Sequence, residues 1–342
     1  MTKANDQPPF TLTIDMVSQV ADIAEQVGRI SATLGFERDL RLRRINRIRT
    51  ITGSLAIEGS TLTEAQVTAI LDGKPVLAPP RELQEARNAL AAYEQLPQWR
   101  GTSEADLLAA HRMLMLGLLD HPGVYRSGGV GVFEGDKVIH MAPPHSQVHR
   151  LMGDLMHWLD TTDAPPLIAS SVFHYEFEFT HPFSDGNGRM GRLWQTLLLS
   201  HWNAAFAWLP VESLVHQQQA AYYQAIRDST KATDCAPFIR FMLGCIRDAV
   251  GKAADRMSAE ASVETSAEIT ARKREATTPQ QLLTLLRQQP KLTLAEAAQA
   301  IGRSARTLER VAALLQAEGK LRFHGPKKVG YWEVLESDGE MT

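Results

Sequence analysis

The stretch His181-Pro-Phe-Ser-Asp-Gly-Asn-Gly-Arg-Met-Gly-Arg192 brings several chemically reactive side chains close together in the chain. Two glycines flank Asn187, so the backbone at this point can approach a ligand closely. A helix that begins here directs its unpaired N–H groups and the positive end of its dipole at that ligand, which favours phosphate. Arg189 and Arg192 are three residues apart and share one face of the helix. The stretch therefore predicts an anion cradle with two arginines beside it.

The same stretch supplies an acid–base group and a metal ligand. Asp185 offers a hard carboxylate oxygen, of the kind that Mg²⁺ takes together with substrate phosphates. A histidine has an ordinary pKa of about 6.5, which makes His181 the natural general base for a hydroxyl nucleophile at neutral pH. These residue types in this order predict chemistry on a nucleotide phosphate.

A dinucleotide-binding fingerprint is the main rival interpretation. The residues Gly186-Asn-Gly-Arg-Met-Gly191 satisfy the pattern GxGxxG, and Glu212 follows about twenty residues later, as the fingerprint requires. The remainder of the chain lacks an alternating series of strands and helices, and the His-Pro-Phe ahead of the first glycine is foreign to the tight turn of that fold. We therefore favour the cradle over the dinucleotide fold.

The segment that leads into this stretch is ambiguous by pattern. Aromatic residues alternate with polar ones from Phe173 to Phe179, which is the period of a strand. Ile168, Val172 and Tyr175 also lie on one helical stripe, and the proline at the start of the segment favours a helix. Pattern alone leaves both structures open.

Most of the other segments before residue 250 have helical periodicity. Thr63-Glu-Ala-Gln66 is typical of a capping box that opens a helix, which Asp72-Gly-Lys-Pro75 ends. Further helices are expected over residues 81–96 and 103–119. The middle of the chain is therefore predicted to be mainly α.

One predicted β-hairpin interrupts the helices. Two β-prone runs, 128–133 and 138–141, flank the turn-like Glu134-Gly-Asp-Lys137. A ribbon of two strands is only marginally stable in water, so we expect this one to lean on helices or on a ligand.

The composition is that of an ordinary globular protein. The 342 residues suffice for about two domains. Its 36 Lys and Arg against 39 Asp and Glu leave a formal charge of −3, which excludes binding of nucleic acid or anionic lipid through overall charge. The two cysteines exclude a disulfide framework and favour a reducing compartment. Since neither a signal peptide nor a run of ~18 apolar residues is evident, we expect a cytoplasmic protein without membrane contact.

The carboxy-terminal part has a different composition. Apolar residues thin out over 251–278, which predicts a helical linker. From 279 to 342, three helical stretches precede two β-prone ones, the order of a winged helix-turn-helix module with its turn near Ile301-Gly-Arg-Ser304. Between residues 280 and 335, nine Lys and Arg exceed four Glu, and this local excess gives modest attraction to phosphate.

The residues from His181 to Arg192 match every defined position of the signature HPFx[D/E]GNGRxxR, and the chain resembles the Fic family over roughly residues 41–250. The resemblance favours a helix at 167–180. It implies a mainly α protein, with a Fic-type helical bundle and a short β-hairpin flap, followed by the winged helix-turn-helix module. It also implies transfer of AMP from ATP to a Ser, Thr or Tyr hydroxyl of a protein, with Mg²⁺ as cofactor and ATP as co-substrate.

The resemblance also implies a role for each residue of the motif. His181 becomes the catalytic base, Asp185 the Mg²⁺ ligand, and Arg189 and Arg192 the residues that stabilise phosphate charge. The phosphate cradle consists of Gly186, Asn187 and Gly188. The hairpin becomes a flap that holds the target segment as an added strand. The docking residues of the flap are expected to be Val130, Gly131, Val132, Val138, Ile139 and His140.

A second match lies nearer the amino terminus. Ser54-Leu-Ala-Ile-Glu-Gly59 fits the family's inhibitory pattern [S/T]xxxE[G/N]. In this respect the chain resembles the autoinhibited members, which have an amino-terminal inhibitory helix. Glu58 would pair with Arg192 where the γ-phosphate must bind, and ATP would then bind in an unproductive pose. A tenfold inhibition requires that the state with Glu58 paired to Arg192 be favoured by about 1.4 kcal/mol. Taken alone, the pattern is equally that of a helix that ends at Gly59 with Ser54 and an exposed Glu58 one turn apart.

We therefore expect four regions along the chain. They are an amino-terminal helical region with the inhibitory helix (1–100), a Fic catalytic core (101–250), a helical linker (251–278) and a winged helix-like module (279–342). Two other functions stay open: a DNA-binding regulator whose Fic core senses a nucleotide, and a deAMPylase in which Glu58 positions a water. The partners expected are ATP, a protein target of unknown identity, DNA or protein at the carboxy-terminal module, and a second copy of the chain.

Overall fold

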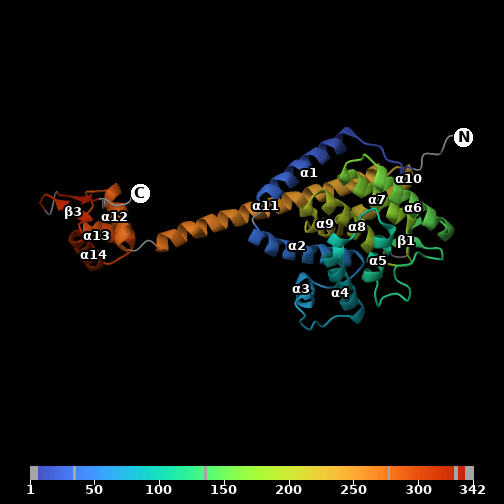
Figure 1. The fold of residues 1–342 in the computed structure, drawn as a ribbon, viewed down its shortest axis with the longest axis horizontal. Helices are drawn as coiled ribbons and strands as arrows, with labels where there is room; N and C mark the ends of the chain where they lie inside the picture. Colours follow the sequence, from blue (N-terminus) through green and yellow to red (C-terminus); the bar gives the residue numbers. More distant parts are fainter. Residues whose placement is uncertain (1–6, 34–35, 135–136, 276–277, 327–329, 336–342) are drawn as a thin grey trace. The chain divides into compact units, whose positions relative to one another are not determined.

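The computed structural model is shown in Figure 1. It describes residues 7–33, 36–134, 137–275, 278–326 and 330–335, except for the side chains at 32–42, 131–140 and 257–275. The chain divides into two compact units, Met1–Arg256 and Met257–Thr342. Helices dominate both units, which confirms the prediction of a mainly α protein.

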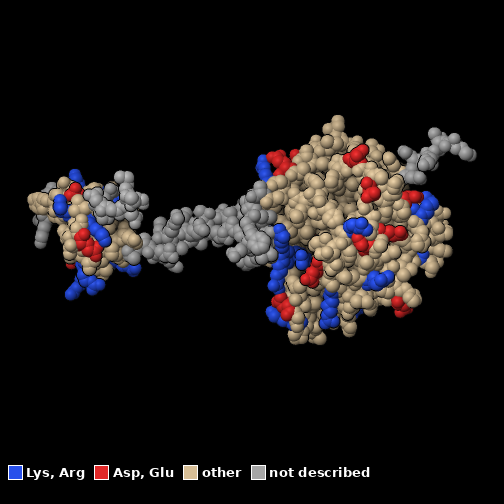
Figure 2. Space-filling view, in the orientation of Figure 1, with Lys and Arg blue, Asp and Glu red and all other residues tan. Residues whose placement is uncertain are grey.

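The first unit is a bundle of helices with one small hairpin. Its helices are α1 (Ile14–Thr33), α2 (Phe36–Ile57), α3 (Glu64–Leu71), α4 (Pro80–Gln95), η1 (Leu96–Gln98), α5 (Glu104–Leu114), α6 (His145–Thr161), α7 (Pro166–Thr180), α8 (Asn187–Trp202), η2 (Ala204–Ala207), α9 (Val211–Gln217), α10 (Gln219–Ala232) and the start of α11 (Ala236–Glu275). Basic and acidic side chains are interspersed over the face seen in Figure 2. None of the helices in the described part of the chain combines the length and the apolarity that crossing a bilayer demands.

The centre of the first unit is the pair α7 and α8, which pack along each other. Residues 167–180 are helical, so the choice that the sequence pattern left open is settled in favour of the helix. Almost every side chain of α7 is buried, from Leu167 through Phe173 and Phe177 to Thr180. A helix that is covered on all sides needs no polar face, and for that reason its sequence carries no clear helical period.

The dinucleotide-fold interpretation is excluded by the strands of the described residues. They form two separate antiparallel pairs, β1 with β2 and β3 with β4, and no parallel sheet. Residues 173–179, which that interpretation requires as a strand, lie within α7.

The helix α2 lies against α9 and also contacts α4 and α8. Gly53 allows the close approach to α9, because a Cβ atom there would come within 2.7 Å of the backbone of Ser213. Two side chains bind the α2 backbone: the Ser213 hydroxyl donates to the Arg49 carbonyl, and Gln219 Nε2 donates to the Ile57 carbonyl, each at 2.9 Å. The helix is therefore held in place on the α9 side.

The end of α2 has the geometry of a glycine C-cap. Gly59 has φ +90°, and the Ser60 N–H donates to the Leu55 carbonyl at 3.1 Å. This closes the last turn with a residue in the left-handed region, where glycine is favoured. The helix ends at Ile57, two residues ahead of Gly59, and Glu58 is the first residue beyond it.

The predicted capping box at the start of α3 is confirmed. The Thr63 side chain accepts a hydrogen bond from the Gln66 N–H, and the Gln66 side chain accepts one from the Thr63 N–H. The helix predicted over 103–119 is shorter than expected, since α5 ends at Leu114. Asn88 of α4 explains the early end, because its Nδ2 donates to the carbonyls of Leu114 and Leu116 and so replaces the next helical N–H groups.

The predicted hairpin is formed by β1 (Gly131–Glu134) and β2 (Lys137–Met141). The strands are antiparallel, with Gly131 opposite Met141 and a register shift between Val132 and Phe133. The hairpin begins where the Val130 carbonyl accepts the Ala142 N–H at 3.2 Å. The turn at 135–136 and the side chains of 131–140 lie outside the described residues. The expected docking role of Gly131, Val132, Val138, Ile139 and His140 therefore stays a prediction.

The second unit has its own small core. It contains α12 (Thr278–Gln288), α13 (Leu294–Ile301), α14 (Ala305–Ala317) and the antiparallel strands β3 (Leu321–His324) and β4 (Tyr331–Val334). Side chains from all of these elements build the core, among them Leu282, Ala298, Leu308 and Trp332. Between α13 and α14 the chain turns at Gly302, with φ +73°, and Ser304 caps α14 by accepting from the Thr307 N–H.

Candidate active site

A residue with left-handed backbone conformation stands at each end of the loop between α7 and α8. His181 ends α7 with φ 47° and ψ 61°, and its N–H donates to the Phe177 carbonyl at 2.9 Å. Gly186 precedes α8 with φ 83°. A left-handed conformation costs a residue other than glycine roughly 1–3 kcal/mol, so the surroundings must hold His181 in place. Asn187 contributes, because its side chain accepts the Phe183 N–H and donates to the Phe183 carbonyl, both at 2.8 Å.

Arg126 fixes the backbone around His181 from the other side. Its guanidinium donates to the carbonyls of His181, Gly128 and Pro143 at 2.7, 2.7 and 2.5 Å, and to that of Thr180 at 3.2 Å. This buried arginine thus connects the end of α7 to both sides of the hairpin. The conformation of His181 is determined by contacts from outside its own segment.

Asp185 occupies the middle of the loop, with its side chain 39% exposed. Its Oδ1 accepts the Gly186 N–H at 2.6 Å and lies 3.3 Å from Arg189 Nη2. The backbone at Asp185 is held by His111, whose Nε2 lies 3.0 Å from the Asp185 carbonyl. The Gly123 N–H donates to His111 Nδ1 at 2.8 Å, which assigns the proton to Nε2. Burial lowers the pKa of His111 to about 4, so this ring is neutral at pH 7.

Two charged residues of α4 reach the same loop. Arg81 Nη2 lies 3.0 Å from Asp185 Oδ2, and Glu85 Oε1 lies 3.2 Å from Arg189 Nη1. Arg189 is almost fully buried, and its Nε has no hydrogen-bond partner among the described residues. A buried N–H group of this kind is costly unless a ligand accepts from it.

Arg192, one helical turn further along α8, contacts the inhibitory pattern directly. Its Nη2 lies 2.6 Å from Glu58 Oε1, and its Nε donates to the Ser54 hydroxyl at 3.1 Å. Nη2 also donates to the Ser54 carbonyl at 3.2 Å. The side chain of Arg192 is 2% exposed and that of Glu58 is 33% exposed. Burial lowers the pKa of Arg192, but the charge and hydrogen bond of Glu58, together with Tyr222 and Glu178, outweigh burial and raise it above its ordinary value.

The carboxylate of Glu58 lies against the first turn of α8. A Cβ atom at Gly188 would come within 2.5 Å of Glu58 Oε1 and 2.9 Å of Arg192 Nη1. Unpaired N–H groups and the positive end of the helix dipole favour an anion at this position. In this structure, the side chain of Glu58 is the anion that occupies it.

The predicted site residues are therefore brought together from distant parts of the chain. The loop and the start of α8 supply His181, Asp185, Gly186, Asn187, Gly188, Arg189 and Arg192, while α2 supplies Ser54 and the turn directly after it supplies Glu58. A group of three or more potential metal ligands is absent from the described residues. The half-exposed carboxylate of Asp185 nevertheless fits Mg²⁺, which takes one or two carboxylates and completes its shell with phosphates and waters.

Comparison with known proteins relates this site to a family. A model of the Fic/DOC family matches residues 101–199. A Fic family protein from Desulfovibrio desulfuricans G20, known from its crystal structure, is 43% identical, and the likeness covers 98% of this chain and 100% of that chain with a TM-score of 0.69. This chain belongs to the Fic family. A structure of Fic-1 (residues 134–508) from Caenorhabditis elegans, 21% identical over 72% of this chain and 74% of that chain, shares the fold with a TM-score of 0.62.

Several curated Fic relatives are named for an enzymatic activity. The "Protein adenylyltransferase Fic" of Nematostella vectensis is 31% identical over 206 residues, which make up 56% of this chain and 45% of that protein. The protein of the same name from Drosophila grimshawi is 28% identical over 211 residues, 56% of this chain and 40% of that protein. This chain spans less than half the length of these relatives.

Several residues of the Fic site were not found from the sequence. Arg81 and Glu85 on α4 and His111 on α5 contact the motif but belong to no recognisable pattern. The only available signal was a histidine and two charged residues in otherwise ordinary helices. Their contacts with the motif arise because α5 packs against α8 and α4 packs against α5.

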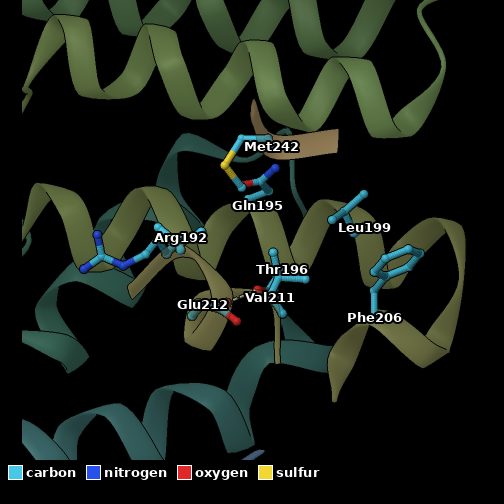
Figure 3. A pocket seen from close by; sticks show the side chains of 9 residues that line it. Arg192, Gln195, Thr196, Leu199, Phe206, Val211, Glu212 and Met242 are labelled. Atoms are coloured by element: carbon cyan, nitrogen blue, oxygen red, sulfur yellow. Dashed lines mark hydrogen bonds between the residues drawn. The ribbon is translucent and has the colours of Figure 1, made fainter. Parts of the chain in front are cut away.

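Glu212, the acidic residue that a dinucleotide fold would place on a ribose, has another environment. It lies in the first turn of α9, 3% exposed, where its Oε1 accepts from the Thr196 hydroxyl at 2.6 Å and from Tyr93 at 3.2 Å. Burial raises the pKa of Glu212. It lines a cavity of about 10 Å³ behind Arg192, and Figure 3 shows the Arg192 guanidinium pointing away from it. Glu212 therefore belongs to the interior of the Fic core.

Proposed function

We propose that this Fic protein is a nucleotidyltransferase that moves AMP from ATP to a Ser, Thr or Tyr hydroxyl of a protein. The names of its curated relatives support the activity, and the geometry of the loop supports the chemistry. The observation that carries the proposal is the anion-binding first turn of α8, with buried Arg189 and Arg192 beside it and His181 at the far end of the same loop.

The reaction assigns one task to each group. His181 takes the proton from the target hydroxyl, and the oxygen attacks the α-phosphorus of ATP. The bond from that phosphorus to the bridging oxygen breaks, and pyrophosphate leaves with the electron pair. Arg189, Arg192 and the N–H group of Gly188 hold the phosphate oxygens and stabilise the charge that develops on them. Mg²⁺ held by Asp185 would supply further positive charge at the phosphates.

We also propose that Glu58 holds the enzyme in an inhibited state. Its carboxylate lies 2.6 Å from Arg192 and against Gly188, where the terminal phosphate of ATP has to bind. The carboxylate of Glu58 competes with that phosphate for the guanidinium of Arg192 and repels it. ATP therefore binds productively only when Glu58 has moved away. Since the Glu58 side chain is 33% exposed, a water beside it is a second candidate nucleophile, and removal of AMP from a modified protein is the alternative reaction.

The target segment is proposed to pair with the hairpin as an added strand. The supporting observation is that, among the residues that the structure describes, β1 and β2 pair only with each other, which leaves an edge for pairing. Arg126 attaches the base of this hairpin to the carbonyl of His181. A strand bound there would be presented to the catalytic histidine.

The second unit is proposed to be a winged helix-like module that recognises the target protein. We assign residues 1–100 to the inhibitory region, 101–250 to the catalytic core, 251–278 to a helical linker and 279–342 to this module. The exposed positions of α14 include Arg306 and Arg310, which would equally contact phosphates of duplex DNA. A salt-dependent shift of duplex DNA by the full chain would favour the DNA-binding alternative.

Intact-mass analysis after incubation with ATP and Mg²⁺ tests the activity. The chain and its Glu58→Gly and His181→Ala variants are incubated with a cell lysate as the source of targets. We expect an AMP-sized increment on proteins with Glu58→Gly, less with the unchanged chain and none with His181→Ala. If His181→Ala modifies as much protein as Glu58→Gly does, the role of His181 is refuted. Release of AMP from the labelled proteins on addition of the unchanged chain would support the reverse reaction.

A further inference from the structure

We propose that Glu178 is a positioning residue for His181. Its carboxylate stabilises the imidazolium that forms when the histidine takes a proton. This rests on the proposed function, since it assigns a second group to the same proton transfer. Glu178 lies on α7, one turn before His181, and is 4% exposed. Its Oε2 lies 3.8 Å from His181 Nδ1.

The structure provides space for this carboxyl group deep in the core. A Cβ atom at Gly191 of α8 would come within 3.1 Å of Glu178 Oε1 and 2.9 Å of the His174 ring. Glu178 Oε1 has no hydrogen-bond partner among the described residues. A buried oxygen without a hydrogen bond is costly, so a compensating interaction is expected when the group is charged.

The other histidine that faces Glu178 does not provide this compensation. His174 Nε2 lies 4.0 Å from Glu178 Oε1, but burial lowers the pKa of His174 to about 3 and the ring is neutral. Gln195 Nε2 donates to Ser171, so Gln195 Oε1 accepts from His174 Nδ1 at 2.6 Å. The remaining lone pair on His174 Nε2 faces the Tyr222 hydroxyl at 3.2 Å. His174 thus has no proton to offer Glu178.

Charged groups on two further helices set when Glu178 ionises. Burial raises the pKa of Glu178 to about 7, Arg192 on α8 opposes this rise, and Glu58 just after α2 adds to it. Tyr222 on α10 stays protonated, because burial and the charge of Glu178 raise its pKa. The carboxyl group is therefore neutral below about pH 7 and charged above it.

The geometry determines which nitrogen does the chemistry. Nδ1 of His181 faces the carboxylate, which leaves Nε2 to take the hydroxyl proton. The imidazolium then has its Nδ1–H directed at Glu178 Oε2. At 3.8 Å the contact is longer than a hydrogen bond and acts as charge attraction. The proton stays on His181, and the carboxylate lowers the cost of placing it there, as a buried carboxylate does for a catalytic histidine elsewhere.

The first test needs no activity. Full-length protein with ¹³C-labelled histidine is titrated by NMR, and the His181 signal is identified by its loss in His181→Gln. In Glu178→Gln we expect the apparent pKa of His181 to fall by about one unit, a tenfold loss of proton affinity. Glu176→Gln is the matched control, because this partly buried residue of α7 contacts Cys235 instead and should leave the titration unchanged. An unchanged His181 pKa in Glu178→Gln would overturn the proposal.

The second test separates positioning from a structural role. AMP transfer is measured from pH 5.5 to 8.5 for Glu58→Gly and for Glu58→Gly with Glu178→Gln. We expect kcat of the double variant to be about tenfold lower at pH 8.5, with the two rates converging toward pH 5.5 and KM for ATP unchanged. An equal loss at every pH would show a structural role and refute the proposal. If neither protein transfers AMP, the proposed function fails, while the NMR titration still decides the role of Glu178.

Discussion

The replacement of Glu58 by glutamine isolates the charge of the proposed brake while keeping the shape of the side chain. The contact removed joins a guanidinium that is 2% exposed to a carboxylate that is 33% exposed, at 2.6 Å. A hydrogen bond to a charged group contributes about 1.5–3 kcal/mol, and the exposure of Glu58 to water places this contact at the low end. About 1.4 kcal/mol corresponds to a factor of ten. We therefore expect Glu58→Gln to transfer AMP about ten times faster than the unchanged chain.

The assay is the initial rate of AMP incorporation from labelled ATP into lysate proteins, at fixed Mg²⁺ and pH. Glu58→Gly should be at least as fast as Glu58→Gln, because it also clears the space over Gly188. Arg44→Ala is the matched control: it removes an ion pair with Asp72 from the same helix, away from the site, and should leave the rate unchanged. Equal rates in the unchanged chain and both Glu58 variants would refute the brake.

Three further predictions test other parts of the structure. His181→Ala should reduce AMP transfer by at least a hundredfold while ATP affinity, measured by calorimetry, changes little; a transfer rate near that of the unchanged chain would exclude it as the base. Gly53→Ala should lower the free energy of unfolding by about 1–3 kcal/mol in urea titrations, because the added Cβ atom meets the α9 backbone at 2.7 Å, and an unchanged midpoint would contradict that packing. The pKa of His174 is lowered to about 3 in the folded protein, so the unfolded chain binds its proton first as the pH falls below about 6.5, and stability is lost in that direction. When the pH falls from 7 to 5, the free energy of unfolding of His174→Asn in urea titrations should therefore decrease by about 2 kcal/mol less than that of the unchanged chain. Equal decreases in the two proteins would show that His174 is not held neutral.

The sequence predictions were accurate where a structure depends on neighbouring residues in the chain, and less accurate where it depends on distant ones. The capping box at Thr63 and the glycine end of α2 at Gly59 were predicted because each depends on a few consecutive residues. The helix predicted over 103–119 was too long, because a side chain from α4, Asn88, supplies the hydrogen bonds that end it at Leu114. The pattern of residues 167–180 left helix and strand open, since burial on every side removes the polar face on which the helical period depends.

The sequence alone determined the loop and the helix start from His181 to Arg192, since glycine conformation, helix polarity and residue type are local properties. Only the tertiary structure decided that Glu58 lies over Gly188 and that Arg81, Glu85, His111 and Glu178 surround the loop. Those contacts join residues far apart in the chain, and they form because α2, α5 and α7 pack against α8 while α4 packs against α2 and α5. Packing of that kind depends on the whole set of side chains, so no short motif records it.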